Sequence, residues 1–217
     1  YFDLLGNVPV LSIRREPLEL RENRVLKRFF DIIFSLIFLC TIFPFVYIII
    51  GIAIKISSPG PIFFKQKRSG EDGEFWCYKF RSMRVNAQCD VLQATANDPR
   101  KTRIGEFIRK TSIDELPQFI NVLMGDMSVV GPRPHMLKHT EEYAQVINKF
   151  MVRHFVKPGI TGWAQVTGYR GETKELWQME GRVSRDIWYI EHWTFMLDLY
   201  IIYKTVYNAI HGEKEAY

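Results

Sequence analysis

The chain has 217 residues, enough for one domain with a sizeable hydrophobic core. Its formal net charge is +5, a mild basic excess that fits an anionic membrane surface, a phosphate-bearing substrate or nucleic acid without choosing among them. The three cysteines are odd in number and form no CxxC pair, which argues against a disulfide framework or a zinc site and indicates reduced, cytosol-facing thiols.

The first 24 residues alternate short apolar and charged pieces. Residues 8–13 predict a short strand, and a polar stretch with two arginines and Pro17 follows it. Because the sequence begins with Tyr1 and not with Met, we expect residues 1–24 to be a junction from a missing N-terminal region, with a disordered terminal arm as the alternative. No signal-peptide pattern is visible in this stretch.

Residues 25–56 hold a long apolar run. Between Phe29 and Ile54 the one charged residue is Asp31, and a straight helix over these residues would reach about 39 Å, more than the ~30 Å hydrocarbon core of a bilayer. A transmembrane helix is therefore the first interpretation. A buried helix in a soluble core is a remote alternative, because the apolar run is so long.

Two features favour a re-entrant helix over a full crossing. Pro44 lies near the middle of the run, where its ring and missing N–H bend a helix. Basic residues flank both ends, and basic loops stay on the cytoplasmic side of a membrane. We therefore predict that residues 25–56 bend at Pro44 and leave the bilayer on the side they entered, and that residues 57–217 form a cytosolic catalytic domain. The flanking basic residues are Arg24, Lys27, Arg28, Lys55, Lys65, Lys67 and Arg68.

Residues 62–70 and 73–83 predict two short strands around a Glu-Asp-Gly turn. Lys79 and Arg81 alternate with Phe80, so both are expected on one polar face of the second strand. A solvated strand face is the plainer explanation of the same pattern. Residues 84–104 are polar and predict a helix followed by a loop.

The acidic pair Asp114 and Glu115 follows a basic pair, Arg109 and Lys110, and precedes an apolar helical pattern. This order predicts that both carboxylates lie in the first turn of a helix, where free N–H groups and the dipole favour negative charge. Two caps fit the pattern: Ser112 with Glu115 as a capping box, or Asp114 as the N-cap.

Capping alone would explain both carboxylates, and caps outnumber catalytic pairs. The alternative is that one carboxylate attacks phosphorus or binds a metal. Such an attack needs cations, since like charges about 4 Å apart repel by ~4 kcal/mol at an effective dielectric of about 20.

Prolines on both sides of Arg133 restrict its backbone, as suits an arginine that binds phosphate with its planar fork. His135 and His139 are four apart, but without an HExxH pattern we do not expect zinc.

The remaining residues predict mostly helices. Residues 136–153 form an amphipathic pattern, residues 157–166 a rigid turn leading into a strand or loop, and residues 172–186 a charged helix. The C-terminal part is rich in tryptophan and tyrosine, which suits a helix at the headgroup level of a membrane; core packing explains any one of them about equally well. Altogether we expect a helix-dominated α+β fold with interfacial amphipathic helices.

Six stretches stand in order along the chain: residues 27–31 (KRFFD), Pro44 in its apolar run, and residues 79–83 (KFRSM), 111–118 (TSIDELPQ), 125–134 (GDMSVVGPRP) and 157–166 (KPGITGWAQV). Together they resemble the bacterial sugar transferase family, the monotopic polyprenyl-phosphate phosphoglycosyltransferases, from about Arg24 to the C-terminus. Three further stretches, 168–173, 178–180 and 215–217, are most similar to undecaprenyl-phosphate glucose phosphotransferases.

This resemblance implies a covalent mechanism at a cytosolic active site. Asp114 would be the nucleophile that forms a phosphosugar-enzyme intermediate, and Glu115 would hold Mg²⁺. The basic residues of the family fall on Lys79, Arg109 and Arg133, which would bind and neutralise the phosphates. At the bend, Phe43 stands before the proline where the family often has Ser, so the break is retained without the hydroxyl.

The resemblance also implies the partners and the location. The donor would be a UDP-sugar, the acceptor undecaprenyl phosphate and the leaving group UMP, at the cytosolic face of the bacterial inner membrane among its lipids. The pathway would be exopolysaccharide, capsule or O-antigen synthesis, with glucose as the first choice of hexose and galactose as the second. A homodimer is an expectation from base rates alone. A non-catalytic membrane scaffold is the second hypothesis, and nucleic acid is not an expected partner.

Overall fold

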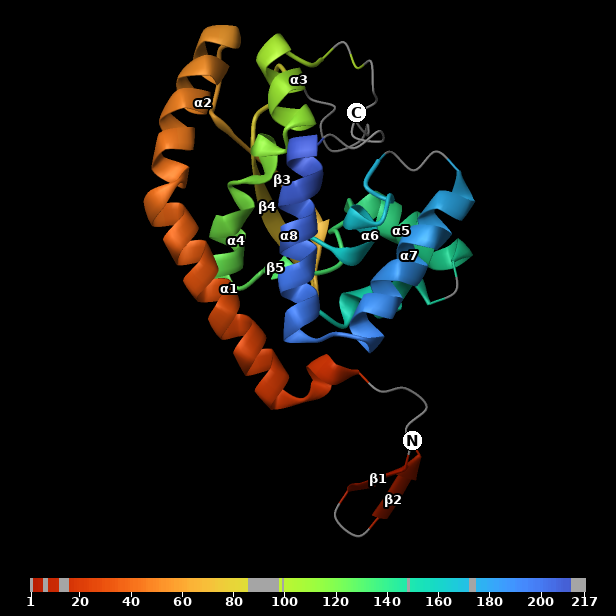
Figure 1. Cartoon of the computed structure of the whole chain (residues 1–217). Helices are drawn as coiled ribbons and strands as arrows, with labels where there is room; N and C mark the ends of the chain where they lie inside the picture. Colours follow the sequence, from red (N-terminus) through yellow and green to blue (C-terminus); the bar gives the residue numbers. More distant parts are fainter. Residues whose placement is uncertain are drawn as a thin grey trace.

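The computed structural model describes residues 2–5, 8–11, 16–85, 98, 100–147, 149–171 and 175–211, and Figure 1 shows the arrangement of its elements. Helices dominate, and the described strands form three two-stranded sheets, which confirms a helix-dominated α+β class. The elements are β1 (Phe2–Leu5), β2 (Val8–Leu11), η1 (Pro17–Glu19), α1 (Arg21–Thr41), α2 (Phe43–Ser57), β3 (Phe63–Ser69), β4 (Glu74–Phe80), α3 (Arg103–Lys110), η2 (Ile113–Glu115), α4 (Gln118–Met124), β5 (Ser128–Val130), α5 (Leu137–Val146), η3 (Phe150–His154), β6 (Gly159–Thr161), α6 (Trp163–Val166), α7 (Leu176–Glu191) and α8 (Phe195–His211), where η marks a 3₁₀ turn.

The long apolar run forms two helices, α1 and α2, which lie along one side of the molecule and bend by 56° where they meet (Figure 1). The break falls at Ile42, just before Pro44, because proline has no N–H for the carbonyl four residues earlier. Among the described residues, no helix is by itself long and apolar enough to cross a membrane, whereas this bent pair together meets that test of length and composition. Its exposed apolar side chains include Val25, Phe29, Leu36, Ile37, Phe45, Ile48, Ile49, Ile52 and Ile56.

Polar contacts anchor the first half of α1 to the rest of the domain. The ammonium of Lys27 lies 2.6 Å from Oδ2 of Asp198 on α8, and Tyr189 and Trp193 donate hydrogen bonds to the same carboxylate at 2.7 and 3.0 Å. One turn further along α1, Asp31 accepts a hydrogen bond from a backbone N–H of β5 at 2.9 Å. The charged residues of the 27–31 stretch therefore tie α1 to α7, α8 and β5.

Two clusters of buried apolar side chains hold the domain together. The larger joins α4, β5, α7 and α8 and receives phenylalanines from α1. The smaller joins α2 and α3 to the end of β4, with Phe80 and Ile108 at its centre. Leu116, which follows the acidic pair, packs against both clusters, so the acidic turn lies where they meet.

Two glycine-containing motifs meet backbone to backbone where β5 pairs in parallel with β6. A Cβ atom on Gly159 would lie 2.0 Å from the nitrogen of Gly131 and 2.4 Å from the carbonyl oxygen of Thr161. A Cβ on Gly162 would lie 2.2 Å from the carbonyl oxygen of Gly131. Only hydrogen fits at these positions, and the close approach sets where the following Pro-Arg-Pro loop lies.

Replacing Gly159 with Ala is expected to cost at least about 2 kcal/mol of folding free energy, because the backbone around the new methyl group must move. The loss is measured as a fall in the thermal unfolding midpoint in detergent. Gly51→Ala is the matched control, since its Cβ would meet only the end of the Ile62 side chain, at 3.2 Å, and should change stability by less than about 1 kcal/mol. Equal midpoints for the two variants would contradict this account.

Several predicted elements differ in extent from those observed. The strand predicted over residues 8–13 is present as β2, paired with β1. Residues 136–153 are not one helix, because α5 ends at Val146 and a left-handed Lys149 (φ +64°) precedes the turn η3. The helix predicted from 172 to 186 begins at Leu176 and extends to Glu191. Most of the helix and loop predicted over 84–104 lies outside the described residues.

The C-terminal aromatic residues divide between core and surface. Tyr189 and Trp193 are 1% and 4% exposed and belong to the main apolar cluster, as the core interpretation predicts. Tyr203 and Tyr207 on α8 are exposed and lie near one another, with ring centroids 6.1 Å apart.

Candidate active site

β3 and β4 form the antiparallel hairpin that the sequence predicts, and Lys79 near its end lies toward Glu115. The prediction that Arg81 shares this polar face is wrong. Arg81 lies beyond the last residue of β4, and its guanidinium donates to the carbonyl oxygens of Ser58 and Pro59 at 2.8 and 2.6 Å. It thereby satisfies two backbone acceptors just after the end of α2.

The acidic pair lies in a tight turn and caps no helix. Asp114 and Glu115 belong to the 3₁₀ turn η2, and α4 begins only at Gln118, after Pro117. Ser112 adopts a left-handed conformation (φ +57°), and its side chain caps no backbone N–H. Both predicted caps are therefore wrong, and capping does not explain why two carboxylates stand here.

A buried amide joins the hairpin to α4, the helix that follows the acidic turn. Asn121 on α4 accepts a hydrogen bond from the N–H of Tyr78 at 2.9 Å and donates one to the carbonyl oxygen of Trp76 at 2.7 Å. Its side chain is fully buried, so replacing it would leave these strand groups unsatisfied. Because Tyr78 precedes Lys79, these bonds position the Lys79 ammonium opposite the acidic turn.

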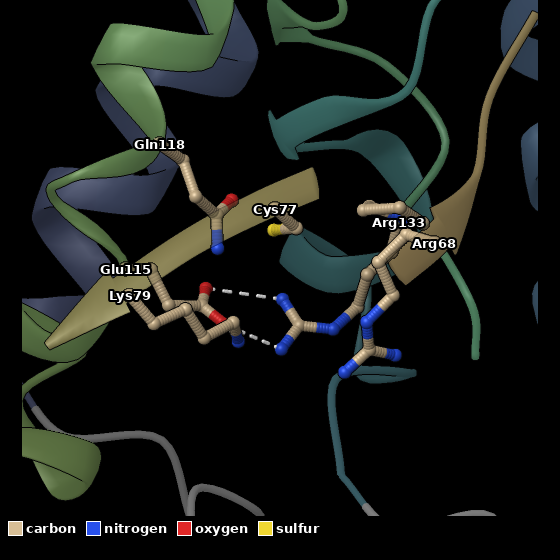
Figure 2. A pocket seen from close by; sticks show the side chains of 7 residues that line it. Arg68, Cys77, Lys79, Glu115, Gln118 and Arg133 are labelled. Atoms are coloured by element: carbon tan, nitrogen blue, oxygen red, sulfur yellow. Dashed lines mark hydrogen bonds and ion pairs between the residues drawn. The ribbon is translucent and has the colours of Figure 1, made fainter. Parts of the chain in front are cut away.

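Glu115 is the centre of a cluster of charges (Figure 2). Its Oε1 lies 2.7 Å from the Lys79 ammonium and 2.6 Å from Nη2 of Arg133, and its Oε2 lies 3.1 Å from Nη1 of Arg133. The two-pronged contact is the geometry by which a guanidinium recognises a carboxylate. Burial raises the pKa of Glu115, but Arg133 and Lys79 outweigh it and hold that pKa well below its ordinary range.

Asp114 has the opposite shift. Burial raises its pKa to about 6 against the opposing charge of Lys79, and the neighbouring Glu115 charge raises it as well, while Arg109 and Arg133 lower it. Asp114 therefore lies within electrostatic reach of all three cations that the sequence indicates. Two adjacent carboxylates whose pKa values are pushed apart are typical of sites where the two groups do different work.

Tertiary contacts hold the loop that carries Arg133 from two sides. The carbonyl oxygen of Pro132 accepts a hydrogen bond from the N–H of Gly159 at 2.9 Å. The carbonyl oxygen of Arg133 itself accepts one from Arg153 at 2.8 Å, and Arg153 forms a buried ion pair with Asp186 at 2.7 Å. The flanking prolines and these bonds together fix the direction in which the Arg133 side chain leaves the backbone.

His135 is buried behind this loop. Its ring nitrogens contact the guanidinium groups of Arg153 and Arg182. Burial and these two charges hold the pKa of His135 well below its ordinary value, so the ring is neutral at pH 7. The side chain of His139 lies outside the described part of the chain. Within the described residues, three or more His, Cys, Asp or Glu side chains nowhere gather into a group able to hold a metal ion.

A small open pocket lies beside the acidic turn (Figure 2). Asp114, which is 8% exposed, and Arg109 are not among the residues that line this pocket. Three lining residues were not indicated by the sequence: Arg68, Cys77 and Gln118. Alternation along β3 and the spacing of three between Glu115 and Gln118 were the available signals. The lining residues are Arg68, Cys77, Lys79, Glu115, Gln118, Arg133 and Pro134.

The carboxylate of Glu115 is an oxygen donor of the kind that Mg²⁺ prefers, whereas Gln118 has its amide nitrogen nearer to Glu115 in Figure 2. Mg²⁺ in proteins is usually held by one or two carboxylates together with phosphate oxygens of the substrate, so an all-protein cage is not required. In this structure Lys79 and Arg133 both pair with the carboxylate oxygens of Glu115.

Comparison with known proteins places this site in a family. A family profile described as "Bacterial sugar transferase" matches residues 22–212, a range that includes every residue that lines the pocket and, except for Arg21, the bent helix pair. The chain belongs to the bacterial sugar transferase family. The family predicted from the six sequence stretches is thus confirmed.

Three relatives of this bacterial sugar transferase differ in how much of their own length it covers. One from Escherichia coli (strain K12), named UDP-glucose:undecaprenyl-phosphate glucose-1-phosphate transferase, is 51% identical over 94% of this chain and 44% of its own. One of the same name from Xanthomonas campestris pv. campestris is 48% identical over 98% and 44%. The exopolysaccharide production protein PSS of Rhizobium leguminosarum bv. phaseoli is 42% identical over 86% and 96%. The chain thus spans less than half the length of the first two.

Proposed function

We propose that this chain transfers a hexose-1-phosphate, with glucose-1-phosphate the first choice, from a UDP-sugar to undecaprenyl phosphate and releases UMP. The names of the two transferase relatives support this donor, acceptor and reaction. The relative named for exopolysaccharide production supports that pathway over capsule or O-antigen synthesis.

The observation that carries the proposal is the meeting of two buried adjacent carboxylates with three cations from three separate elements. Lys79 comes from β4, Arg109 from α3 and Arg133 from the loop after β5, and all three act on Asp114. Such an arrangement suits a reaction in which an anionic oxygen must approach an anionic diphosphate. Fixed cations offset the repulsion and stabilise the charge that spreads over the phosphoryl oxygens in the transition state.

The proposed chemistry has two steps. The carboxylate oxygen of Asp114 attacks the sugar-bearing phosphorus of the UDP-sugar, and the bond from that phosphorus to the bridging oxygen breaks, so that UMP leaves with the electron pair. An oxygen of undecaprenyl phosphate then attacks the same phosphorus and displaces the Asp114 carboxylate. A soluble donor and a lipid acceptor thus use one site in turn, which gives ping-pong kinetics.

For this attack the donor phosphate must pass from the pocket to Asp114. Lys79 and Arg133 would exchange Glu115 for the phosphate, and Glu115 would then be available to Mg²⁺, with Gln118 beside it. When bound, Mg²⁺ supplies further positive charge against the diphosphate oxygens. The raised pKa of Asp114, about 6, leaves its carboxylate ionised at neutral pH and more basic than an exposed aspartate.

We also propose that α1 and α2 form a re-entrant segment at the cytosolic face of the inner membrane. The 56° bend, the basic residues on both flanks and the exposed apolar side chains along the pair support this placement. It would bring the pocket to headgroup depth, where the phosphate of a lipid acceptor lies.

The pH dependence of the first step is expected to follow Asp114. Because burial raises its pKa to about 6, the nucleophile is protonated below that pH and ionised above it. The kcat/KM for the UDP-sugar should fall about tenfold per pH unit below pH 6 and level off above pH 7. In a ping-pong reaction this constant reports only the donor half-reaction, so the titrating phosphate of the acceptor does not contribute. A flat profile from pH 5 to 7 would contradict the assignment of Asp114.

The direct test is UMP release by the purified chain with undecaprenyl phosphate and Mg²⁺, scored for UDP-glucose, UDP-galactose and N-acetylated UDP-sugars in turn. Release from UDP-glucose above the others is expected. Preference for UDP-galactose would correct the hexose and keep the reaction. No UMP release from any donor, together with retained binding of partner proteins, would replace the enzyme by the scaffold hypothesis.

A further inference from the structure

The pocket holds a cation that neither the motifs nor the proposed mechanism uses. Arg68, at the end of β3, lines the pocket together with Lys79, Glu115 and Arg133. Figure 2 shows its guanidinium on the same side of the pocket as that of Arg133, with Lys79 and Glu115 opposite. The role of Arg68 must therefore be sought within the pocket.

The strand register brings Arg68 to the pocket. Residues two apart on a strand share a face, and directly opposed residues of an antiparallel pair lie on the same face. Arg68 therefore shares a face with Gln66, which is opposite Cys77, and with Lys79, which is two residues from Cys77. Lys67 lies on the other face, where its ammonium pairs with Glu74 at 2.8 Å.

Two contacts hold Arg68 in this direction. Its Nη2 donates a hydrogen bond to the side-chain oxygen of the buried Gln66 at 2.7 Å. The backbone at this end of β3 is bridged to the loop that carries Arg133, through the N–H of Ser69 and the carbonyl oxygen of His135 at 3.3 Å. Arg68 and Arg133 are thus presented by two segments that are joined through their backbones.

The residues that line the pocket carry a net positive charge, which favours the binding of an anion. Three lining residues are cationic (Arg68, Lys79 and Arg133) and one is anionic (Glu115), which leaves +3 − 1 = +2. Asp114 and Arg109 do not line the pocket, and because they carry opposite charges at neutral pH and act on each other they leave this sum unchanged. Two guanidinium groups in one small pocket are suited to phosphoryl oxygens, which accept paired hydrogen bonds from each planar fork.

We infer that Arg68 is a substrate-binding residue whose guanidinium contacts a phosphate group in this pocket alongside Arg133. The inference rests on the proposed function and adds to it a fourth cation, one that binds substrate. The phosphate belongs either to the nucleoside diphosphate donor or to the polyprenyl phosphate acceptor. Both present the same chemistry to the guanidinium, so the experiment has one arm for each.

Arg68→Gln removes the charge and keeps a polar side chain of similar length. It is expected to raise the KM for UDP-glucose, for undecaprenyl phosphate or for both by roughly tenfold to a hundredfold, the usual weight of a charge-assisted hydrogen bond. Arg68→Lys keeps the charge without the fork and should recover only part of this loss. Lys67→Gln is the matched control: it changes the net charge equally on the next residue of the strand, faces away from the pocket, and should leave both KM values within about twofold.

Equilibrium binding of UDP-glucose without acceptor provides a second readout that does not depend on turnover. A rise in one KM alone assigns Arg68 to that substrate, and a rise in both assigns it to a shared phosphate position. If Arg68→Gln fails to fold, as its thermal unfolding will tell, Arg68→Lys decides. Folded variants with both KM values and the binding of UDP-glucose unchanged would overturn the inference. A wild-type chain that binds UDP-glucose without releasing UMP would instead overturn the proposed function, and the binding comparison would still decide the role of Arg68.

Discussion

Replacing Asp114 with Asn is expected to abolish UMP release and at the same time to stabilise the fold at neutral pH. The amide has no anionic oxygen to attack phosphorus, so turnover should fall at least about a thousandfold, as for loss of a covalent nucleophile. The gain in stability follows from the pKa. Burial raises it from 3.8 to about 6, so the folded state favours the neutral form, and stability is lost as the pH rises through 6. A neutral amide should recover about 1–3 kcal/mol of this at pH 7.

Two measurements on one preparation test this prediction, namely UMP release and the thermal unfolding midpoint in detergent at pH 7 and at pH 5. The stabilising effect should shrink at pH 5, where the wild-type carboxyl is itself mostly neutral. Asp72→Asn, at an exposed position in the hairpin turn, makes the same charge change and should alter neither activity nor stability appreciably. Retained turnover in Asp114→Asn would remove Asp114 from its role as nucleophile.

Replacing Lys27 with Met is expected to destabilise the domain by about 3–5 kcal/mol, the second large effect. The substitution leaves Asp198, whose side chain is 1% exposed, as a buried carboxylate without its counter-charge. Because Lys27 belongs to α1 and Asp198 to α8, the loss should also loosen α1 from the rest of the domain. Thermal unfolding measures the stability. Faster cleavage within α1 by limited proteolysis measures the detachment of this helix.

The control for this prediction is an ion pair of the same kind at the surface. Lys110→Met breaks the ion pair between Lys110 and Glu106, in which both side chains are more than half exposed, and should leave the thermal unfolding midpoint nearly unchanged. A loss below about 1 kcal/mol in Lys27→Met would show that the α1 anchor depends on apolar packing and not on the buried ion pair.

The nature of the acidic pair illustrates what local patterns can and cannot settle. Ser112, Asp114 and Glu115 satisfy the rules for helix caps, yet a left-handed Ser112 and the packing of Leu116 between two apolar clusters turn the segment into a 3₁₀ turn. Rules for helix caps rank the possible local structures by differences in free energy of about 1 kcal/mol, the average contribution of one cap. The packing of Leu116, which is partly buried, against two apolar clusters outweighs that preference, and those clusters are built from segments far apart in the sequence.

The two arginines of the hairpin region show the same limit. Strand alternation predicts Arg81 near Lys79, whereas β4 ends at Phe80 and the guanidinium turns to the end of α2. The sequence presents Arg68 as one of the basic residues that flank the apolar run, whereas its register with β4 brings it into the pocket. Register and strand ends depend on pairing, which a single strand does not reveal.

By itself the sequence determined the family, the helix-dominated class, the break near Pro44, the β3–β4 hairpin and the identity of the acidic pair with its three cations. These features follow from ordered motifs, from hydrophobic periodicity and from the stereochemistry of proline and glycine. Each of these signals is contained in a few neighbouring residues. Only the tertiary structure decided that Glu115 holds Lys79 and Arg133, that the pKa of Asp114 rises, and that Arg68 joins the site. Those properties depend on burial and on charges brought together from β3, β4, α3 and the loop after β5, and such distances exist only once the chain has folded.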